Sequence, residues 1–416
     1  MKRERYVLPY NILSALMALV LCIGCGEDRT YEYEEWTGKN QSMQSLMSEW
    51  YLWGDSLKDL EWKTYFGNES DFFTKLTAQA PVTDKWSYCS IDTIEKDYHE
   101  RGLFNHLDSY GLDLSIIDDP TRLTNQSYAR IITIYPGSPA EECGLKRGEF
   151  IGYFDGTKVT ANNISQLKSG TAKNIVVNSL DFIGDSAIWK SVDTLALAAS
   201  RQVKDVQVMV AERIRLEDAT AAYVMLSNLN EDDFVGYIEN TKGADILILD
   251  LRLCNDGTLE NACKLASFIA GEEASSKVFC QTIWNKGKQS LNQTYKYGDY
   301  ATIGYTDAKD IYIITGTYTQ GAAEWLIKGL KATTDEKVAV IGSTTAGQNV
   351  MLKAIPSEYK YTLYPAVAYV ADADGNYDYN GGIEPDMAID EYLYHPLRDY
   401  GDVNEMVLNY ILNVYE

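Results

Sequence analysis

A near-continuous apolar run stands in the second half of the chain and reads Ile246-Leu247-Ile248-Leu249-Asp250-Leu251. A strand that is buried on both faces of a parallel sheet needs apolar residues at nearly every position, so this run predicts such a strand. Helical and strand-like patterns then alternate, at 259–270 (helix), 311–315 (strand), 322–332 (helix) and 338–341 (strand). This alternation predicts an α/β domain over 205–416, with Met406–Leu412 as a helix that docks on it.

The residues that follow the three strands form the candidate site. They are Asp250–Gly257, Thr315–Glu324 and Gly342–Gln348. The carboxyl ends of parallel strands meet at one edge of a sheet, and active groups gather at that edge in α/β domains. We therefore expect these three segments to lie together.

The preceding region, 104–204, has a different pattern, because short strands alternate there with glycine-containing turns. Ala129–Tyr135 and Phe150–Phe154 are predicted strands, and Ser138-Pro139 is typical of a helix start. The stretch Ser138–Glu149 resembles the core motif of PDZ domains, with Glu149 where that family usually has Asp. The resemblance implies a PDZ-like, β-rich domain over 104–204.

The PDZ resemblance also implies a peptide-binding loop upstream of that motif. Its residues would be Tyr110, Gly111, Leu112, Asp113 and Leu114. In that family the loop captures a peptide C-terminus with backbone N–H groups, and the adjacent strand takes the peptide onto its edge. Asp113 would repel a bound carboxylate, so the alternative is a PDZ-shaped spacer that captures no peptide C-terminus.

The first 25 residues have the pattern of a secretion signal. Lys2, Arg3 and Arg5 precede an apolar run from Ile12 to Ile23, which is too short for a stable membrane span. The following Gly24-Cys25 resembles the lipobox of bacterial lipoproteins, which implies a lipid anchor at Cys25. The expected location is the cell envelope, on the outer membrane, facing the periplasm or the surface. The alternative is an ordinary signal peptide over residues 1–25.

Residues 26–103 connect this signal to the PDZ-like domain. Residues 26–40 are polar and predict a tether, and residues 41–100 predict a mostly helical region that is rich in aromatic residues. The clusters Trp50–Trp53 and Trp86–Tyr88 are interpreted as core packing of this small N-terminal helical region.

Composition excludes several classes of function. Of 416 residues, 60 are Asp or Glu and 37 are Lys or Arg, so the formal net charge is −23. A chain this acidic repels phosphate backbones, so we expect no nucleic-acid partner and favour neutral or cationic ones. The three histidines are scattered, and the five cysteines beyond Cys25 form no CxxC pair. No metal site or cofactor is therefore predicted, and the acidic segment 372–378 lacks calcium-loop spacing.

The three strand-end segments, in this order after a PDZ-like domain, resemble the S41 peptidases, the tail-specific or C-terminal processing serine proteases. Trp50–Trp53, Trp86–Tyr88 and the turn Gly382-Ile383-Glu384-Pro385-Asp386 add to the resemblance. It implies an α/β peptidase domain with ClpP/crotonase-like layering over 205–416. It also implies acyl transfer, in which a neutral Lys takes the proton of a Ser nucleophile and backbone N–H groups stabilise the oxyanion.

The positions of that Ser and that Lys hold other residues here. The family pattern Thr-x-Ser-Ala-x-Glu reads Thr319-Gln320-Gly321-Ala322-Ala323-Glu324, so Gly321, which has no side chain, stands at the nucleophile position. The family pattern Gly-x-x-x-x-Gly-Lys spans Gly342–Gln348, so Gln348 stands at the base position. Its neutral amide accepts no proton near neutral pH.

The segment that would stabilise the oxyanion also departs from the family. The pattern Asp-Leu-Arg-x-Asn-Gly-Gly-Gly becomes Asp250–Gly257, which ends in Asn255, Asp256 and Gly257, and Ala322 follows the nucleophile position. Asp256 would place negative charge beside a developing oxyanion, which is the wrong sign for catalysis.

Three hypotheses follow from these departures. The first is a catalytically inactive pseudopeptidase, an envelope lipoprotein that binds peptides or unfolded protein. The second is an active serine endopeptidase that uses displaced groups, such as the hydroxyls of Thr317, Thr319 or Ser343 or the thiol of Cys254 with a nearby amine. The third is a carrier of a small apolar ligand, for which a closed apolar pocket near Gly321 is expected.

Overall fold

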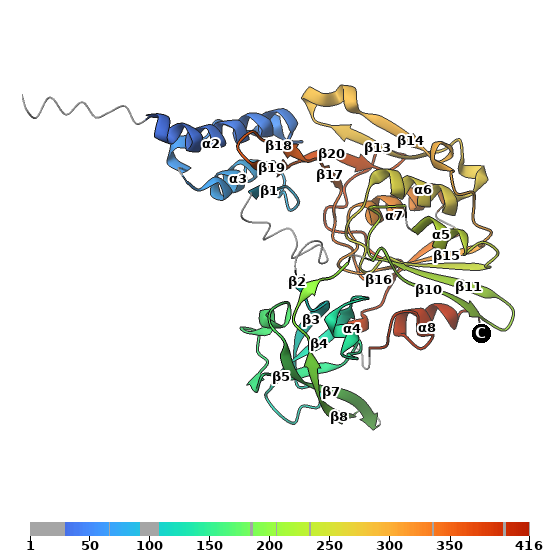
Figure 1. Cartoon of the computed structure of the whole chain (residues 1–416). Coiled ribbons are helices and arrows are strands. Elements are labelled where there is room, and N and C mark those ends of the chain that lie inside the picture. The colour runs from blue at the N-terminus through green and yellow to red at the C-terminus, as the bar shows by residue number, and fades with distance from the viewer. Residues whose placement is uncertain are drawn as a thin grey trace, which may run out of the picture. The chain divides into compact units, whose positions relative to one another are not determined.

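The computed structural model of the chain describes residues 30–65, 67–91, 108–183, 186–204, 206–232, 234–334, 337–393 and 397–415. The predicted signal peptide and its Cys25 lie outside these ranges. The chain forms two compact units. The first comprises Met1–Asp92 and Ala354–Pro365, and the second comprises Thr93–Lys353 and Ala366–Glu416 (Figure 1).

The first unit combines helices with a three-stranded antiparallel sheet. Its elements are α2 (Thr30–Trp50), η1 (Gly54–Ser56), η2 (Trp62–Tyr65), α3 (Glu69–Thr77), β1 (Tyr88–Ile91), β18 (Ile355–Pro356) and β19 (Tyr361–Tyr364). Met43, Met47 and Phe72 are fully buried between these elements. Helix α2 begins at Thr30, inside the segment that the sequence predicted as a tether.

Strands β18 and β19 join this unit from far along the sequence. Strand β19 pairs antiparallel with β1, which places Tyr88 opposite Tyr364 and Ile91 opposite Tyr361. The rings of Tyr88 and Tyr364 stack with their centroids 4.3 Å apart. Residues 354–365 were expected in the domain 205–416. They belong to the first unit instead, because β19 pairs with β1 there.

The β-rich module of the second unit spans 108–204. Its main sheet has the order β3-β4-β5-β7-β8, with β6 paired to β5. Its elements are β2 (Asp108–Ser109), β3 (Leu112–Asp118), β4 (Ser127–Ile134), α4 (Pro139–Glu142), β5 (Phe150–Phe154), β6 (Thr157–Lys158), η3 (Ile164–Leu167), β7 (Lys173–Ile183), β8 (Ser186–Leu197) and β9 (Arg201–Gln202). Ser138 caps α4 by accepting from Glu141 N at 3.2 Å, as its sequence signature predicts.

Six strands form the main sheet of the α/β domain, in the order β10-β11-β12-β15-β16-β21. They are β10 (Val208–Arg215), β11 (Thr220–Leu226), β12 (Ile246–Asp250), β15 (Asp310–Thr315), β16 (Val338–Gly342) and β21 (Met387–Ala388). Neighbours are parallel except for β10 and β11. The three predicted strands are confirmed as the neighbours β12, β15 and β16.

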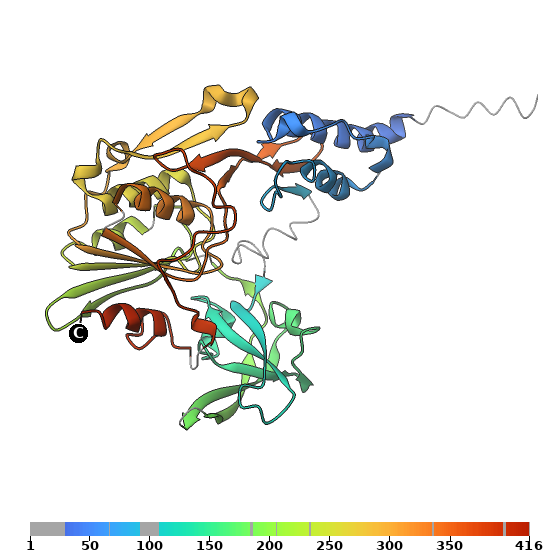
Figure 2. The ribbon, with the colours of Figure 1, turned by 180° about the vertical axis from the view of Figure 1, so that it is seen from behind.

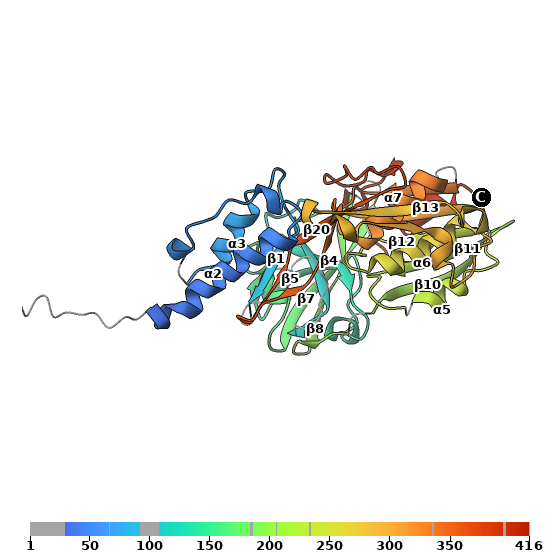
Figure 3. The same cartoon turned by 90° about the horizontal axis from the view of Figure 1, so that it is seen from above.

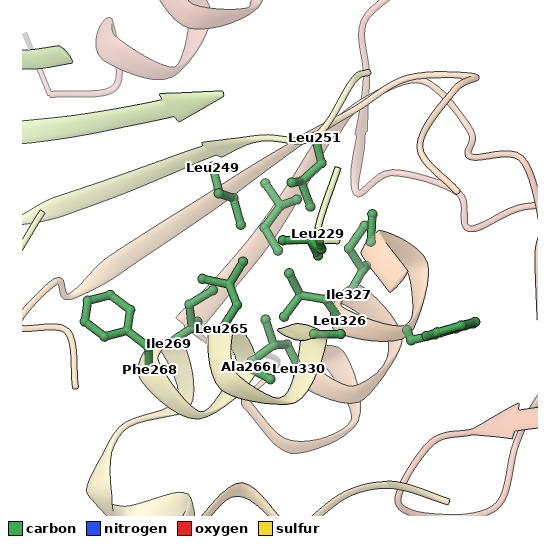
Figure 4. Close-up of a cluster of buried hydrophobic side chains, with 14 of the residues drawn as sticks. Leu229, Leu249, Leu251, Leu265, Ala266, Phe268, Ile269, Leu326, Ile327 and Leu330 are labelled. Carbon is green, nitrogen blue, oxygen red and sulfur yellow. The ribbon is translucent and has the colours of Figure 1, made fainter. Parts of the chain in front are cut away.

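Helices cover both faces of this sheet (Figures 1 and 2). They are α5 (Phe234–Glu239), α6 (Leu259–Ala270) and α7 (Ala322–Thr334) on one face and α8 (Met406–Leu412) on the other. Leu247 and Leu249 belong to the core on the α6 and α7 side, whereas Ile246 and Ile248 belong to the core on the α8 side. This two-sided burial explains why β12 is apolar at nearly every position. Figure 4 shows Leu249 and Leu251 above the leucines and isoleucines of α6 and α7.

A second, antiparallel sheet has the order β14-β13-β20-β17. Its strands are β13 (Val278–Trp284), β14 (Gln293–Lys296), β17 (Val350–Leu352) and β20 (Ala366–Ala371), and the remaining short helices are η4 (Glu272–Ala274), η5 (Lys286–Leu291), η6 (Tyr297–Tyr300) and η8 (Glu391–Leu393). Seen from above, β13 runs beside α7 (Figure 3). Phe279 of β13 packs directly on Gly329 of α7, where a Cβ would lie 2.5 Å from Phe279 Cδ2.

Candidate functional site

The structure brings the three strand-end segments together, as the sequence predicts. Gln320 N donates to Cys254 O at 2.9 Å, which joins the segment after β15 to the segment after β12. Ala346 N donates to Thr319 O at 3.0 Å, which joins the segment after β16 to the same loop. The carboxyl ends of β12, β15 and β16 therefore form one continuous site.

Gly321 and Gln348 lie side by side in this site. Gly321 is buried at the start of α7 and has a φ of +59°. A Cβ built on Gly321 would lie 3.3 Å from Gln348 Oε1 and 3.7 Å from its Nε2. A side chain at position 321 would thus touch the side chain at position 348, although neither residue present supplies a nucleophile or a base.

A pair of carboxamides fills the space beside Gly321. Gln320 Nε2 donates to Gln348 Oε1 at 2.8 Å, and Gln348 Nε2 donates to Val350 O at 3.2 Å. Both side chains are buried. The sequence analysis did not single out Gln320, because it stands at a variable position of the motif. Its contact with Gln348 fixes the amide orientation at the base position.

Glu324 holds the loops of the site in place. Its carboxylate accepts from Gly321 N at 3.1 Å, from Gly347 N at 2.6 Å and from Gln348 N at 2.6 Å, and also from the Thr345 hydroxyl. Burial raises its pKa from 4.5 to about 7, and these donors oppose the shift only in part. Through these hydrogen bonds, Glu324 connects α7 with the loop after β16.

Asp256 lies in the loop after β12, next to the start of α7. Its Oδ1 accepts from Gly257 N at 2.8 Å, and its Oδ2 accepts from Asn230 Nδ2 at 3.0 Å. Gly257 lies against Ala322, because a Cβ on Gly257 would be 2.8 Å from Ala322 Cβ. A carboxylate thus takes the N–H that would face an oxyanion, which disfavours stabilisation of a negative intermediate there.

Asn255, in the same loop, is buried, and its N–H donates to Ser227 O at 3.2 Å. This contact ties the segment after β12 to the end of β11. The N–H of Asn255 therefore holds this loop against the end of β11.

Three side chains that could replace the missing nucleophile or base have other partners. Thr319 is buried, and its hydroxyl donates to Leu251 O at 2.8 Å. Lys331 contacts the Asp386 carboxylate at 3.1 Å, and Lys337 donates to Ile269 O at 3.3 Å. Within the described ranges, which contain none of the three histidines, no hydrogen bond joins Thr317, Thr319 or Ser343 to a lysine.

A buried ionic network lies under the end of β12. Arg252 donates to Asp250 at 2.6 Å, to Glu391 at 2.6 Å and to Glu405 at 2.9 Å. Arg147 of the β-rich module donates to the same Glu391 at 2.7 Å. Burial would raise the pKa of Glu391, but the guanidinium groups of Arg252 and Arg147 lower it from 4.5 to about 2. No local sequence pattern indicates that Glu391 and Glu405, far along the chain, are partners of Arg252.

The predicted peptide-binding loop lies at the start of β3, beside α4. Tyr110 is fully buried and donates its hydroxyl to Thr171 O. Gly111 has a φ of +78° and no room for a side chain, because a Cβ would lie 2.5 Å from Ser138 Oγ. Leu112 is buried in the core of the module, and Leu114 packs partly against it. Asp113 accepts a hydrogen bond from the Tyr135 hydroxyl at 2.9 Å.

Two cavities lie away from Gly321. One has a volume of about 780 Å³ and is lined by the loop after β16 and by α8, through residues that include Ser343 and Tyr410. The other, of about 260 Å³, lies between β10, β11 and α5. Neither lining contains Gly321 or Gln348, so neither is the pocket that the apolar-ligand hypothesis expects.

In the part of the chain that the structure describes, no group of three or more His, Cys, Asp or Glu side chains is arranged to hold a metal ion. None of the helices in those ranges has both the length and the apolar character needed to cross a bilayer.

Two curated proteases are similar to this chain. Carboxy-terminal processing protease CtpA of Bacillus subtilis (strain 168) is 23% identical over 287 residues, covering 65% of this chain and 55% of that protein. CtpB of the same organism is 22% identical over 278 residues, covering 64% and 53%. The chain thus spans about half the length of these curated relatives.

A solved structure shares the fold at greater length. The crystal structure of a putative S41 protease from Bacteroides fragilis NCTC 9343 superposes with a TM-score of 0.79 at 24% identity, covering 89% of this chain and 96% of that one. Residues 38–88 match the peptidase S41 N-terminal domain, and residues 220–389 match peptidase family S41. The chain belongs to peptidase family S41.

Proposed function

We propose that this S41 family member is a pseudopeptidase, a lipoprotein of the cell envelope that binds peptides or unfolded protein segments without cutting them. The observation that carries the proposal is the contact between positions 321 and 348, where a Cβ on Gly321 would meet Gln348 at 3.3 Å. The fold keeps the two positions together, but the residues there cannot attack a carbonyl or take a proton. Loss of a nucleophile and its base costs serine hydrolases several orders of magnitude in rate.

The ligand class comes from the relatives. Carboxy-terminal processing proteases act on protein chains, as their name states, and this chain is similar to two of them. A family member that has lost its chemistry can retain the surface that held the protein chain. The net charge of −23 favours neutral or cationic segments over nucleic acid.

The test is proteolysis of fluorescein-labelled casein by purified residues 26–416. The natural chain is compared with Gly321→Ser, Gln348→Lys and with the matched control Gly321→Ala, Gln348→Lys, which lacks the hydroxyl. We expect no cleavage by the natural chain and none by the control, and a measurable rate in the first double variant. Cleavage by the natural chain, or its covalent labelling by a serine-reactive phosphonate within the α/β domain, would overturn the proposal in favour of displaced catalytic groups.

Asp256 is the third departure from the family pattern, and a further substitution tests its effect on the reaction. Adding Asp256→Gly to the first double variant removes the carboxylate that accepts from Gly257 N at 2.8 Å. We expect this triple variant to be faster than the double variant by about tenfold or more, because an oxyanion donor is worth about 10²–10³ in rate. Equal rates would show that Asp256 is not an obstacle to acyl transfer.

The proposed lipid anchor has a separate test. Expressed in a Gram-negative host, the natural chain is expected to enter the detergent phase on Triton X-114 partition. The Cys25→Ser variant is expected in the aqueous phase. Cys22→Leu, which supplies the residue that a lipobox usually has at this position, is the matched control and should keep the anchor. Detergent partition of Cys25→Ser would contradict the anchor at this residue.

A further inference from the structure

The loop Tyr110–Leu114 has few backbone donors left for a peptide carboxylate. Tyr110 N donates to Lys168 O at 3.0 Å, and Gly111 N donates to Ser109 Oγ at 2.9 Å. Both Tyr110 and Gly111 are buried, so neither bond is readily exchanged for an external acceptor. Capture of a C-terminal carboxylate depends on such N–H groups, and here at least two of them are committed.

The edge of β3 is nevertheless accessible to an extended segment. β3 stands at one end of the order β3-β4-β5-β7-β8, and across the described part of the chain no strand pairs with its outer edge. An edge of this kind presents backbone groups that an extended peptide can pair with. The surface for strand addition is therefore present even though the carboxylate site is compromised.

Asp113 sets the charge at this edge. Its carboxylate is half-buried on β3 and accepts from Tyr135 of β4 at 2.9 Å. Lys168 and Tyr318 are the other titratable side chains whose charges interact with it. Tyr318 lies three residues before Gly321 and is 45% exposed. The charge of Asp113 therefore acts on Tyr318 in the loop after β15.

Covering this carboxylate with a bound peptide has an energetic consequence. The Tyr135 hydroxyl is a neutral partner and leaves the charge of the Asp113 carboxylate uncompensated when water is removed. A Lys or Arg side chain beside it would compensate that charge with a charge-assisted hydrogen bond. Lys168 is exposed, so water screens its attraction to Asp113. A peptide that supplies its own cation at this point avoids the desolvation penalty.

We propose that the edge of β3 binds an internal, extended peptide segment that places a basic side chain at Asp113, instead of capturing a peptide C-terminus. The inference rests on the proposed peptide-binding function and specifies its ligand. It reverses the expectation from the PDZ resemblance, because the recognised charge is positive and lies on a side chain.

The experiment measures binding of fluorescein-labelled decapeptides to residues 26–416 by fluorescence anisotropy at pH 7.5. The peptides alternate Val and Ser around a central Lys, norleucine or Glu, and each is made with a free C-terminal carboxylate and with a C-terminal amide. We expect the Lys peptide to bind about tenfold more tightly than the norleucine peptide, and the Glu peptide most weakly. The amide and the free acid should bind equally.

Two variants separate this site from the general charge of the chain. Asp113→Asn should remove the preference for Lys, while Asp118→Asn, an exposed residue at the far end of the same strand, should keep it. Thermal denaturation checks that Asp113→Asn is folded, and the norleucine peptide shows whether its binding surface is intact. A Lys preference that survives Asp113→Asn would overturn the inference.

The remaining outcomes distinguish this inference from the proposed function. Tighter binding of the free acid than of the amide would establish C-terminal capture and refute the inference. Binding without any charge preference would also refute it, while leaving the pseudopeptidase proposal in place. No binding of any peptide would refute both. Mass spectrometry of the incubated peptides reports cleavage, which would refute the pseudopeptidase proposal alone.

Discussion

At the residue scale, the backbone conformation of Gly321 makes any side chain at this position unfavourable. Its φ of +59° lies in the left-handed region, which side chains disfavour. We expect Gly321→Ser alone to lower the free energy of unfolding by about 1–2 kcal/mol and to produce no cleavage, because Gln348 remains at the base position. Urea denaturation of the natural chain, Gly321→Ser and Gly321→Ala measures this. Equal stability of all three would contradict the backbone argument.

Glu324 gives the site a dependence on pH. Between pH 4.5 and about 7 the folded chain keeps a proton that the unfolded chain releases. The free energy of unfolding therefore decreases through this group as pH rises across that window, by about 3 kcal/mol, and is level above it. Urea denaturation at several pH values should show this decrease as a difference between the natural chain and Glu324→Gln. A difference that is constant with pH would contradict the raised pKa.

Sequence order was enough to predict which residues would meet in the site. Gly321, Gln348 and Asp256 were identified by the resemblance of three segments to motifs of the family, and the structure brings these segments together. The partners of those residues could not be predicted. Gln320 pairs with Gln348 and Asn230 pairs with Asp256 only because loops from different strands converge, and no local pattern marks either partner.

At the scale of elements, Glu391 of η8 connects β12 to the β-rich module. Replacing it leaves Arg147 and Arg252 buried with one carboxylate fewer, so we expect Glu391→Gln to lower the free energy of unfolding by about 3–5 kcal/mol. The lowered pKa of Glu391 means that its contribution is present above pH 4.5 and is lost as pH falls toward 2.

Acid titration of the folded chain checks this contribution. The stability difference between the natural chain and Glu391→Gln should shrink below pH 4.5. Glu384→Gln, at an exposed position, is the matched control and should change stability little. A loss of stability in Glu391→Gln that is as small as in the control would contradict a buried ion pair.

The contact between α7 and β13 makes a helix glycine necessary. Alanine is normally favoured over glycine inside a helix by about 1 kcal/mol. At Gly329 its Cβ would lie 2.5 Å from Phe279 Cδ2, so we expect Gly329→Ala to destabilise the chain by about 1–3 kcal/mol. Gly236→Ala in α5, where nothing lies within 4 Å, should be neutral or stabilising. Melting temperatures of the two variants that shift in the same direction would contradict this account.

Helices and central strands were predictable because their signals are local. α6 follows the N-cap Thr258, whose side chain accepts from Asn261 N, and its bounds match the predicted 259–270. The second sheet and the hairpin of β18 and β19 were not predicted. Their strands are short, and each becomes a strand only through partners that are distant in sequence.

At the scale of the whole molecule, the inserted hairpin links the two units through the chain. Leu352 pairs with Ala366, so the ends of the insertion are neighbours in the second sheet. Removing residues 30–91 should leave Tyr361 and Leu363 without β1 and cause 1-anilinonaphthalene-8-sulfonate binding or aggregation. Replacing 354–365 by a short Gly-Ser loop in the same variant should restore solubility. Aggregation of both variants alike would show that the second unit needs the first for another reason.

The pairing of β1 with β19 also sets an order of events during synthesis. The partner of β1 leaves the ribosome about 270 residues later, which at about 5–20 residues per second is a delay on the order of tens of seconds. Throughout that interval Tyr88–Ile91 is an unpaired strand with apolar and aromatic side chains. A chaperone that binds unpaired apolar strands would therefore bind the first unit of this chain before translation ends. The sheet of that unit starts with β1 and is completed only when β19 has been synthesised.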